Sequence, residues 1–115
     1  DSCEVSQFYM KPPRHWYYSG GEVRAMVQST GMFDCNRRVE VFSFQVIAFD
    51  PDQPEVACLV ADLDGELLDT PLQRAQQIAE EFAVGWDCST DETIQFGNEQ
   101  QSSLDEILYA RRAAR

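Results

Sequence analysis

The run from 39 to 49, VEVFSFQVIAF, limits the choice of fold more than any other part of this sequence. It is rich in β-branched and aromatic residues, which favour a strand. Successive residues of a strand point to opposite faces, and large apolar side chains fall on both faces here. We therefore expect this strand to be covered on both sides, at least in part.

Turn residues and weaker strand signals surround this run. A strong turn follows at 50–54, DPDQP, and residues 55–63 are predicted to return as the second strand of a hairpin. Residues 2–9 and 92–96 are weaker strand candidates. The sequence thus predicts four strands.

Three segments carry signals for the start of a helix. Residues 19–22, SGGE, have the S-x-x-E pattern of a capping box, and an apolar i, i+3, i+4 stripe follows them up to Gly31. Residues 70–73, TPLQ, place proline at the favoured first helical position, and Gly85 closes that helix. Residues 103–106, SLDE, form the third box. The middle helix should dock through its apolar stripe: Leu72, Ala75, Ile78, Ala79, Phe82 and Ala83.

The predicted element order is β, α, β, β, α, β, α within a single α+β domain, residues 1–115. The first six elements resemble the ferredoxin-like βαββαβ order over about residues 2–97, with an additional C-terminal helix. The resemblance is one of element order only. It implies two helices on one face of a four-stranded antiparallel sheet.

Charge is distributed very unevenly along the chain. Formal net charge is −11, but residues 1–49 hold five acids and five bases, whereas residues 50–106 hold fifteen acids and one base, Arg74. The negative electrostatic potential of such a chain repels nucleic acid and anionic membranes, because binding either of them requires Lys and Arg side chains that neutralise phosphate groups. The pattern favours a protein partner with a basic surface. Solubility alone is the alternative explanation.

These observations give our leading hypothesis, a non-enzymatic acidic interaction protein that binds and blocks a basic, nucleic-acid-binding type of surface. Immunity proteins and phage or mobile-element anti-defence inhibitors use such nucleic-acid-mimicking charge, and the analogy is one of surface only. Acids off the apolar stripe, and aromatic residues with arginine, are the predicted contact residues. They are Glu80, Glu81, Asp87, Asp91, Glu92, Arg14, Trp16, Tyr17 and Tyr18.

The aromatic residues belong to the segment 11–22, KPPRHWYYSGGE, which is predicted to be a loop before the first helix. Its rings either contact a partner or cap one end of the core. A helix N-terminus can also hold an anion. An alternative function is therefore a small-anion-binding regulatory domain, expected to be a homodimer, with the anion at Arg14, His15, Gly20 and Gly21.

A small enzyme on the same scaffold is the second alternative. His15 is the only histidine, and the sequence lacks nucleophile-elbow, zincin, Walker and dinucleotide motifs. The acidic run 62–69, DLDGELLD, fails as an EF-hand loop because valine and proline occupy the terminal ligand positions. It is predicted to be a turn followed by a helix start. We expect no metal and no cofactor.

Four cysteines lie at 3, 35, 58 and 88, far apart and without metal-ligand spacing. In a ferredoxin-like sheet Cys35 and Cys88 would precede the two edge strands, too far apart for a disulfide. The sequence therefore predicts free thiols and a cytoplasmic protein.

Overall fold

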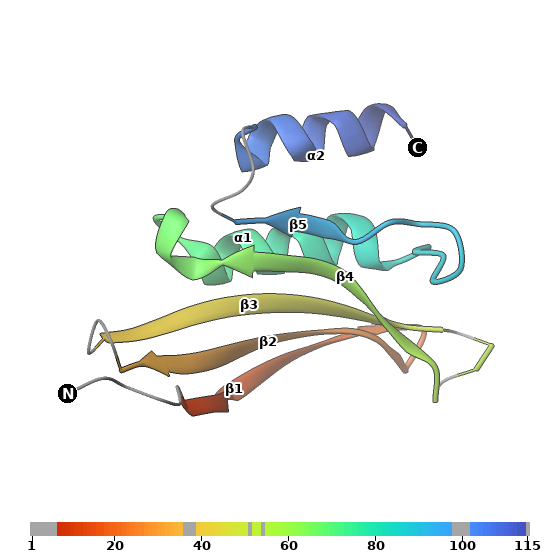
Figure 1. Ribbon diagram of the computed structural model, residues 1–115. Helices are drawn as coiled ribbons and strands as arrows, with labels where there is room; N and C mark the ends of the chain where they lie inside the picture. The colour runs from red at the N-terminus through yellow and green to blue at the C-terminus, as the bar shows by residue number, and fades with distance from the viewer. Residues whose placement is uncertain (1–6, 36–38, 51, 54, 98–101, 115) are drawn as a thin grey trace.

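The structure, a computed structural model, describes residues 7–35, 39–50, 52–53, 55–97 and 102–114. Four strands form an antiparallel meander in chain order: β1 (Gln7–Ser19), β2 (Glu22–Asp34), β3 (Val39–Phe49) and β4 (Ala57–Asp64). A helical crossover then leads to β5 (Ile94–Phe96), which pairs parallel to β4, and the sheet order is β1-β2-β3-β4-β5 (Figure 1).

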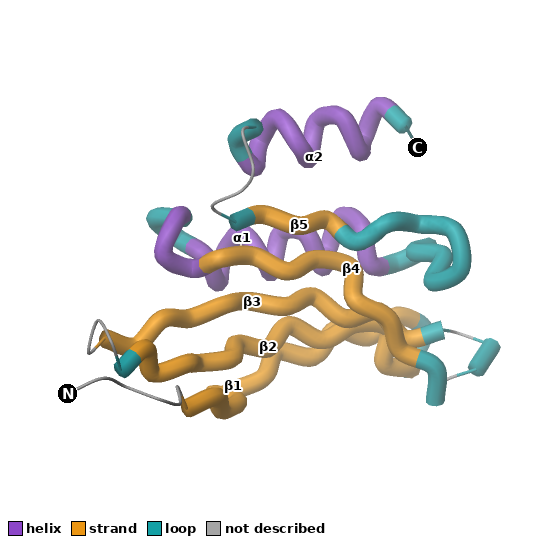
Figure 2. The backbone as a smooth tube through the Cα atoms, viewed as in Figure 1, coloured by secondary structure: helices purple, strands orange, loops and turns teal. Residues whose placement is uncertain are grey.

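The helices follow the meander. After a short 3-10 turn, η1 (Gly65–Leu67), the crossover consists of α1 (Pro71–Ile78) and a π-helical continuation, η2 (Ala79–Ala83). The C-terminal helix is α2 (Leu104–Ala113) (Figure 2). In the part of the chain that the structure describes, no helix combines the length and the apolar composition needed to cross a lipid bilayer.

The predicted ferredoxin-like fold is wrong, although the α+β class holds. The segment expected to be the first helix is the strand β2, so four strands precede the first helix. The cause lies in the turn between β1 and β2. Gly20 (φ 61°) and Gly21 (φ 80°) both take positive φ, and Ser19 pairs with Glu22. Positive φ at both central residues is what a two-residue hairpin turn of type I′ requires. The SGGE signature therefore closes a hairpin and does not cap a helix.

We expect Gly21→Ala to lower the free energy of unfolding by about 1–2 kcal/mol, because an L residue with a Cβ is strained in the left-handed region. Apart from its chain neighbours, no atom of the described residues lies within 4 Å of a Cβ built at Gly21, so the variant tests backbone strain. Gly97→Ala is the matched control, since that position is equally open and lacks a positive φ. Equal urea midpoints for the two variants would contradict this account of the turn.

The apolar stripe predicted for the middle helix is confirmed. Ala75, Ile78 and Phe82 are buried in one cluster with Val27 of β2 and Val46 of β3. The helix begins at Pro71, and Gly85 lies just beyond its end with φ 83°. This cluster is the core, and it lies between one face of the sheet and the helices.

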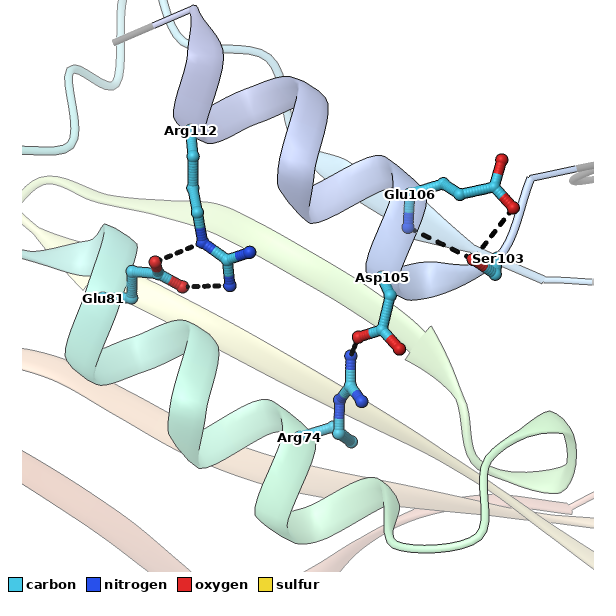
Figure 3. A network of polar contacts seen from close by, with 6 residues as sticks. All are labelled: Arg74, Glu81, Ser103, Asp105, Glu106 and Arg112. Atoms are coloured by element: carbon cyan, nitrogen blue, oxygen red, sulfur yellow. Dashed lines mark hydrogen bonds and ion pairs between the residues drawn. The ribbon is translucent and has the colours of Figure 1, made fainter.

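Of the three predicted capping boxes, only the one at 103–106 is confirmed among the described residues, because Thr70 makes no side-chain capping bond at the start of α1. The Glu106 amide donates to Ser103 Oγ (3.2 Å), and that hydroxyl donates to the Glu106 carboxylate (3.2 Å). Two ion pairs then join α2 to the crossover helix: Arg74 to Asp105 (2.5 Å), and Arg112 to Glu81 (Figure 3). Because Leu104 and Leu108 enter the same core, α2 is part of the domain.

The cysteines differ from the sequence prediction. Cys58 at the start of β4 and Cys88 in the loop before β5 form a disulfide, with Cα atoms 5.7 Å apart. Cys35 is disulfide-bonded as well, and the described part of the chain contains no free cysteine. The prediction of free thiols is wrong because it relied on ferredoxin-like strand order. In the observed topology β5 is next to β4, which brings positions 58 and 88 together. Cys3 lies outside the described residues.

The acidic run 62–69 shapes the backbone at the end of β4. The Asp64 carboxylate accepts a hydrogen bond from the Glu66 amide (2.9 Å) and caps η1. Gly65 is needed for close approach, because a Cβ there would lie 2.7 Å from the Phe42 carbonyl oxygen. The predicted turn and helix start are confirmed. Within the described ranges, no group of three His, Cys, Asp or Glu side chains is placed to hold a metal ion.

Candidate protein-binding surface

The aromatic segment 14–18 belongs to strand β1, not to the predicted loop. Its side chains therefore alternate between faces. Tyr17 packs against the core on the helix side, whereas Trp16 (46 % exposed) and Tyr18 (65 % exposed) lie on the open face. Trp16 stacks on Phe49 of β3, with ring centroids 6.3 Å apart. Burial, and then the charge of Glu80, raise the pKa of Tyr17.

The residues of the predicted anion site do not converge. His15 is opposite Val27, a core residue, and its Nδ1 is 3.4 Å from the Gln76 amide nitrogen of α1. Arg14, the residue before it in the strand, is exposed. Gly20 and Gly21 form a hairpin turn, so the helix N-terminus that would supply their amides does not exist. The structural basis for an anion at this position is thereby lost.

The β1–β2 turn, the β3–β4 turn and the loop before β5 lie at the same end of the sheet, on the right of Figure 1. Residues at this end line two grooves. We call them the hairpin-end grooves. The first, of ≈450 Å³, is lined by Trp16, Glu22, Val23, Arg24, Phe49 and Asp50. The second, of ≈470 Å³, is lined by Ser19, Arg24, Phe49, Asp50, Ala83, Val84, Gly85, Trp86, Asp87 and Cys88.

Sequence reasoning identified Trp16 and Asp87 in these grooves but missed Arg24, Phe49, Asp50 and Trp86. These residues come together only when 19–22 is a hairpin turn and position 88 is tied to β4. The Gly20-Gly21 pair was the available signal, because two adjacent glycines between strand-forming runs are typical of a tight hairpin.

Three of the five predicted acidic contact residues have structural partners. Glu81 accepts two hydrogen bonds from Arg112, one of them 2.7 Å long. The Asp87 carboxylate accepts from the hydroxyl (2.6 Å) and the amide (2.9 Å) of Ser89, which hold its pKa below the usual range. Asp91 accepts from the Asp87 amide (2.8 Å). These carboxylates stabilise helix and loop geometry, so reversing their charge would also disturb the fold.

Other carboxylates at this end are available to solvent. Glu80 on η2 and Glu92 before β5 are exposed, and so are Asp52 and Glu55 in the β3–β4 turn. Two arginines of the described residues in this region are engaged. Arg24 pairs with Glu22 (3.0 Å), and Arg111 donates to the Glu92 and Thr93 carbonyls. The groove walls thus combine the aromatic rings of Trp16, Phe49 and Trp86 with acidic residues. The acids in the walls are Glu22, Asp50 and Asp87, and the exposed Asp52 and Glu55 lie in the same turn as Asp50.

No protein-family model matches the chain, and neither the curated proteins nor the solved structures include a significant match to it.

Proposed function

We propose that this protein is a non-enzymatic binding domain that holds, and thereby blocks, a basic surface segment of a partner protein in the hairpin-end grooves. The observation that carries the proposal is the set of acidic residues, Glu22, Asp50 and Asp87, that line the grooves beside the aromatic rings. Lysine and arginine side chains combine an apolar stem with a cationic head. Aromatic faces bind both parts, and surrounding carboxylates attract the charge.

The cysteines bear on where the partner is found. Disulfides persist in oxidising compartments and are rare in the cytosol. The Cys58–Cys88 bond joins β4 to the loop that forms one groove wall. We therefore place the protein in an exported or periplasmic setting, in place of the predicted cytoplasm. The proposed basic partner is accordingly a secreted or cell-surface protein.

Binding can be tested with a synthetic peptide of ten residues rich in lysine and arginine, monitored by tryptophan fluorescence. We expect binding at low salt that weakens as salt rises, because screening shortens to about 8 Å at physiological ionic strength. The variant D52K/E55K should weaken binding by about tenfold, or 1.4 kcal/mol. Both side chains are exposed, and the Asp52 hydrogen bond in this turn comes from its main-chain amide, which donates to Asp50 (2.8 Å).

The control for this test changes the charge equally elsewhere. D69K/Q73K/Q77K raises the net charge by the same four units at exposed positions on and before α1. It should leave affinity within about twofold, because screened charges act locally. Equal losses in the two variants would show that net charge alone attracts the peptide. Binding that is independent of salt, or absent, would refute a basic partner at this surface.

A further inference from the structure

The two edges of the sheet are protected differently. β5 is only three residues long, and Arg111 of α2 donates to the carbonyls of Glu92 and Thr93 just before it. β1 is thirteen residues long and forms the opposite edge. Among the residues that the structure describes, no strand lies outside it. A long edge presents unpaired backbone groups, which pair readily with another strand.

Half of this edge is protected by its own sequence. The register with β2 shifts between Lys11 and His15, so that residues 12–14, PPR, lie opposite the single residue Gln28. Prolines and bulges are devices that block edge pairing. A second register shift lies between Tyr17 and Tyr18, but there the extra residue is Arg24 of β2. From His15 to Ser19, β1 itself therefore contains no proline and no bulge. The available edge is therefore 15–19.

We propose that two copies of the protein associate through this segment, antiparallel, with the two-fold axis at Tyr17. This register places Trp16 of one copy opposite Tyr18 of the second copy, and the two-fold axis repeats the pair. Both side chains lie on the open face and are exposed in the single chain. Aromatic pairs directly opposite each other stabilise antiparallel strands, so the segment is complementary to itself.

The charge distribution limits the strength of this association. β1 and β2 carry Lys11, Arg14 and Arg24 against Glu22 and Asp34, whereas residues 50–106 carry a net −14. Most acidic residues follow β3 in the chain, but the charge of Glu80 raises the pKa of Tyr17 of β1, and Asp50 lines a groove with Trp16. Repulsion between these acids of the two copies weakens the pairing. Five residues from each copy form a small interface, at the weak end of the known range. We therefore expect a reversible, concentration-dependent dimer.

Analytical ultracentrifugation over a wide concentration range tests the proposal. The weight-average mass of the wild type should rise from 13.1 kDa toward twice that value. W16K/Y18K and W16E/Y18E each place like charges opposite each other, so each alone should stay monomeric. Mixed in equal amounts, they place lysine opposite glutamate and should form a mixed dimer. Tyr109→Lys and Tyr109→Glu change a tyrosine on α2 that is 73 % exposed, and they should dimerise like the wild type.

Trp16 stacks on Phe49, so its replacement could alter the fold locally. Tyr18→Lys alone avoids this risk and should reduce the dimer fraction at every concentration. A wild type that is monomeric throughout would overturn the proposal. Dimerisation of either double variant alone would also overturn it. Failure of the two double variants to associate when mixed would overturn it as well, provided that their circular dichroism matches that of the wild type.

Discussion

Phe82→Ala is expected to lower the free energy of unfolding by about 3–5 kcal/mol. Phe82 is 1 % exposed, lies in the core cluster between the helices and the sheet, and has the Arg112 guanidinium 6.0 Å from its ring centroid. Removing the ring leaves a cavity that close-packed neighbours fill only partly. The loss is a large share of the 5–15 kcal/mol that usually holds a domain folded. Chemical denaturation followed by far-UV circular dichroism measures it.

Val84→Ala is the control for Phe82→Ala, because Val84 is two positions further along the chain and 55 % exposed. Its replacement should shift the free energy of unfolding by about 0.5 kcal/mol or less, as surface changes usually do. If both variants unfold at the same denaturant concentration, the crossover helix does not dock through its apolar stripe.

The second large effect is expected when the Cys58–Cys88 disulfide is removed. The bond closes a loop with a sequence separation of 30. The chain-entropy relation for a loop of this length predicts a loss of about 3–4 kcal/mol in C58S/C88S. The stability is lost because the unfolded chain gains freedom. The change should be measured by urea denaturation at equilibrium, without reductant.

Mass spectrometry after alkylation provides the chemical check. Unreduced, denatured wild-type protein should show no label on Cys58 or Cys88, and label should appear on both after reduction. Labelling of both residues before reduction would contradict the pairing. A double variant as stable as the wild type would show that the unfolded chain is already constrained in this region.

Much of the fold is local in origin, and those parts were predictable. Proline at position 71, the reciprocal Ser103–Glu106 bonds and the β-branched and aromatic residues of 39–49 all act within a few residues. The segment after Gly21 was ambiguous, because its apolar residues fit both a helical stripe and a strand. Ala25 and Val27 are buried on the helix side, while Met26 pairs with Trp16 on the other face. The Gly20-Gly21 turn was the sequence signal that favoured a strand over a helix for this segment.

The binding surface depends on topology, which explains why it was predicted only in part. Sequence identifies acids but not their hydrogen-bond partners, so Glu81 and Asp91 could not be distinguished from Asp52 and Glu55. The former hold α2 and a loop in place, while the latter are exposed at the hairpin end. Phe49 and Trp86 become neighbours only through the crossover from β4 to β5.

The order of strands in the sheet also has a kinetic consequence. Each of the first four strands pairs with its neighbour in the chain, so these pairs require only short-range loop closure. The pairing of β4 with β5 must wait for the intervening helix to reach the sheet. We therefore expect the meander to form early and the crossover late. Oxidation of Cys58, at the start of β4, with Cys88, in the loop after the crossover helix, then marks the late step during maturation.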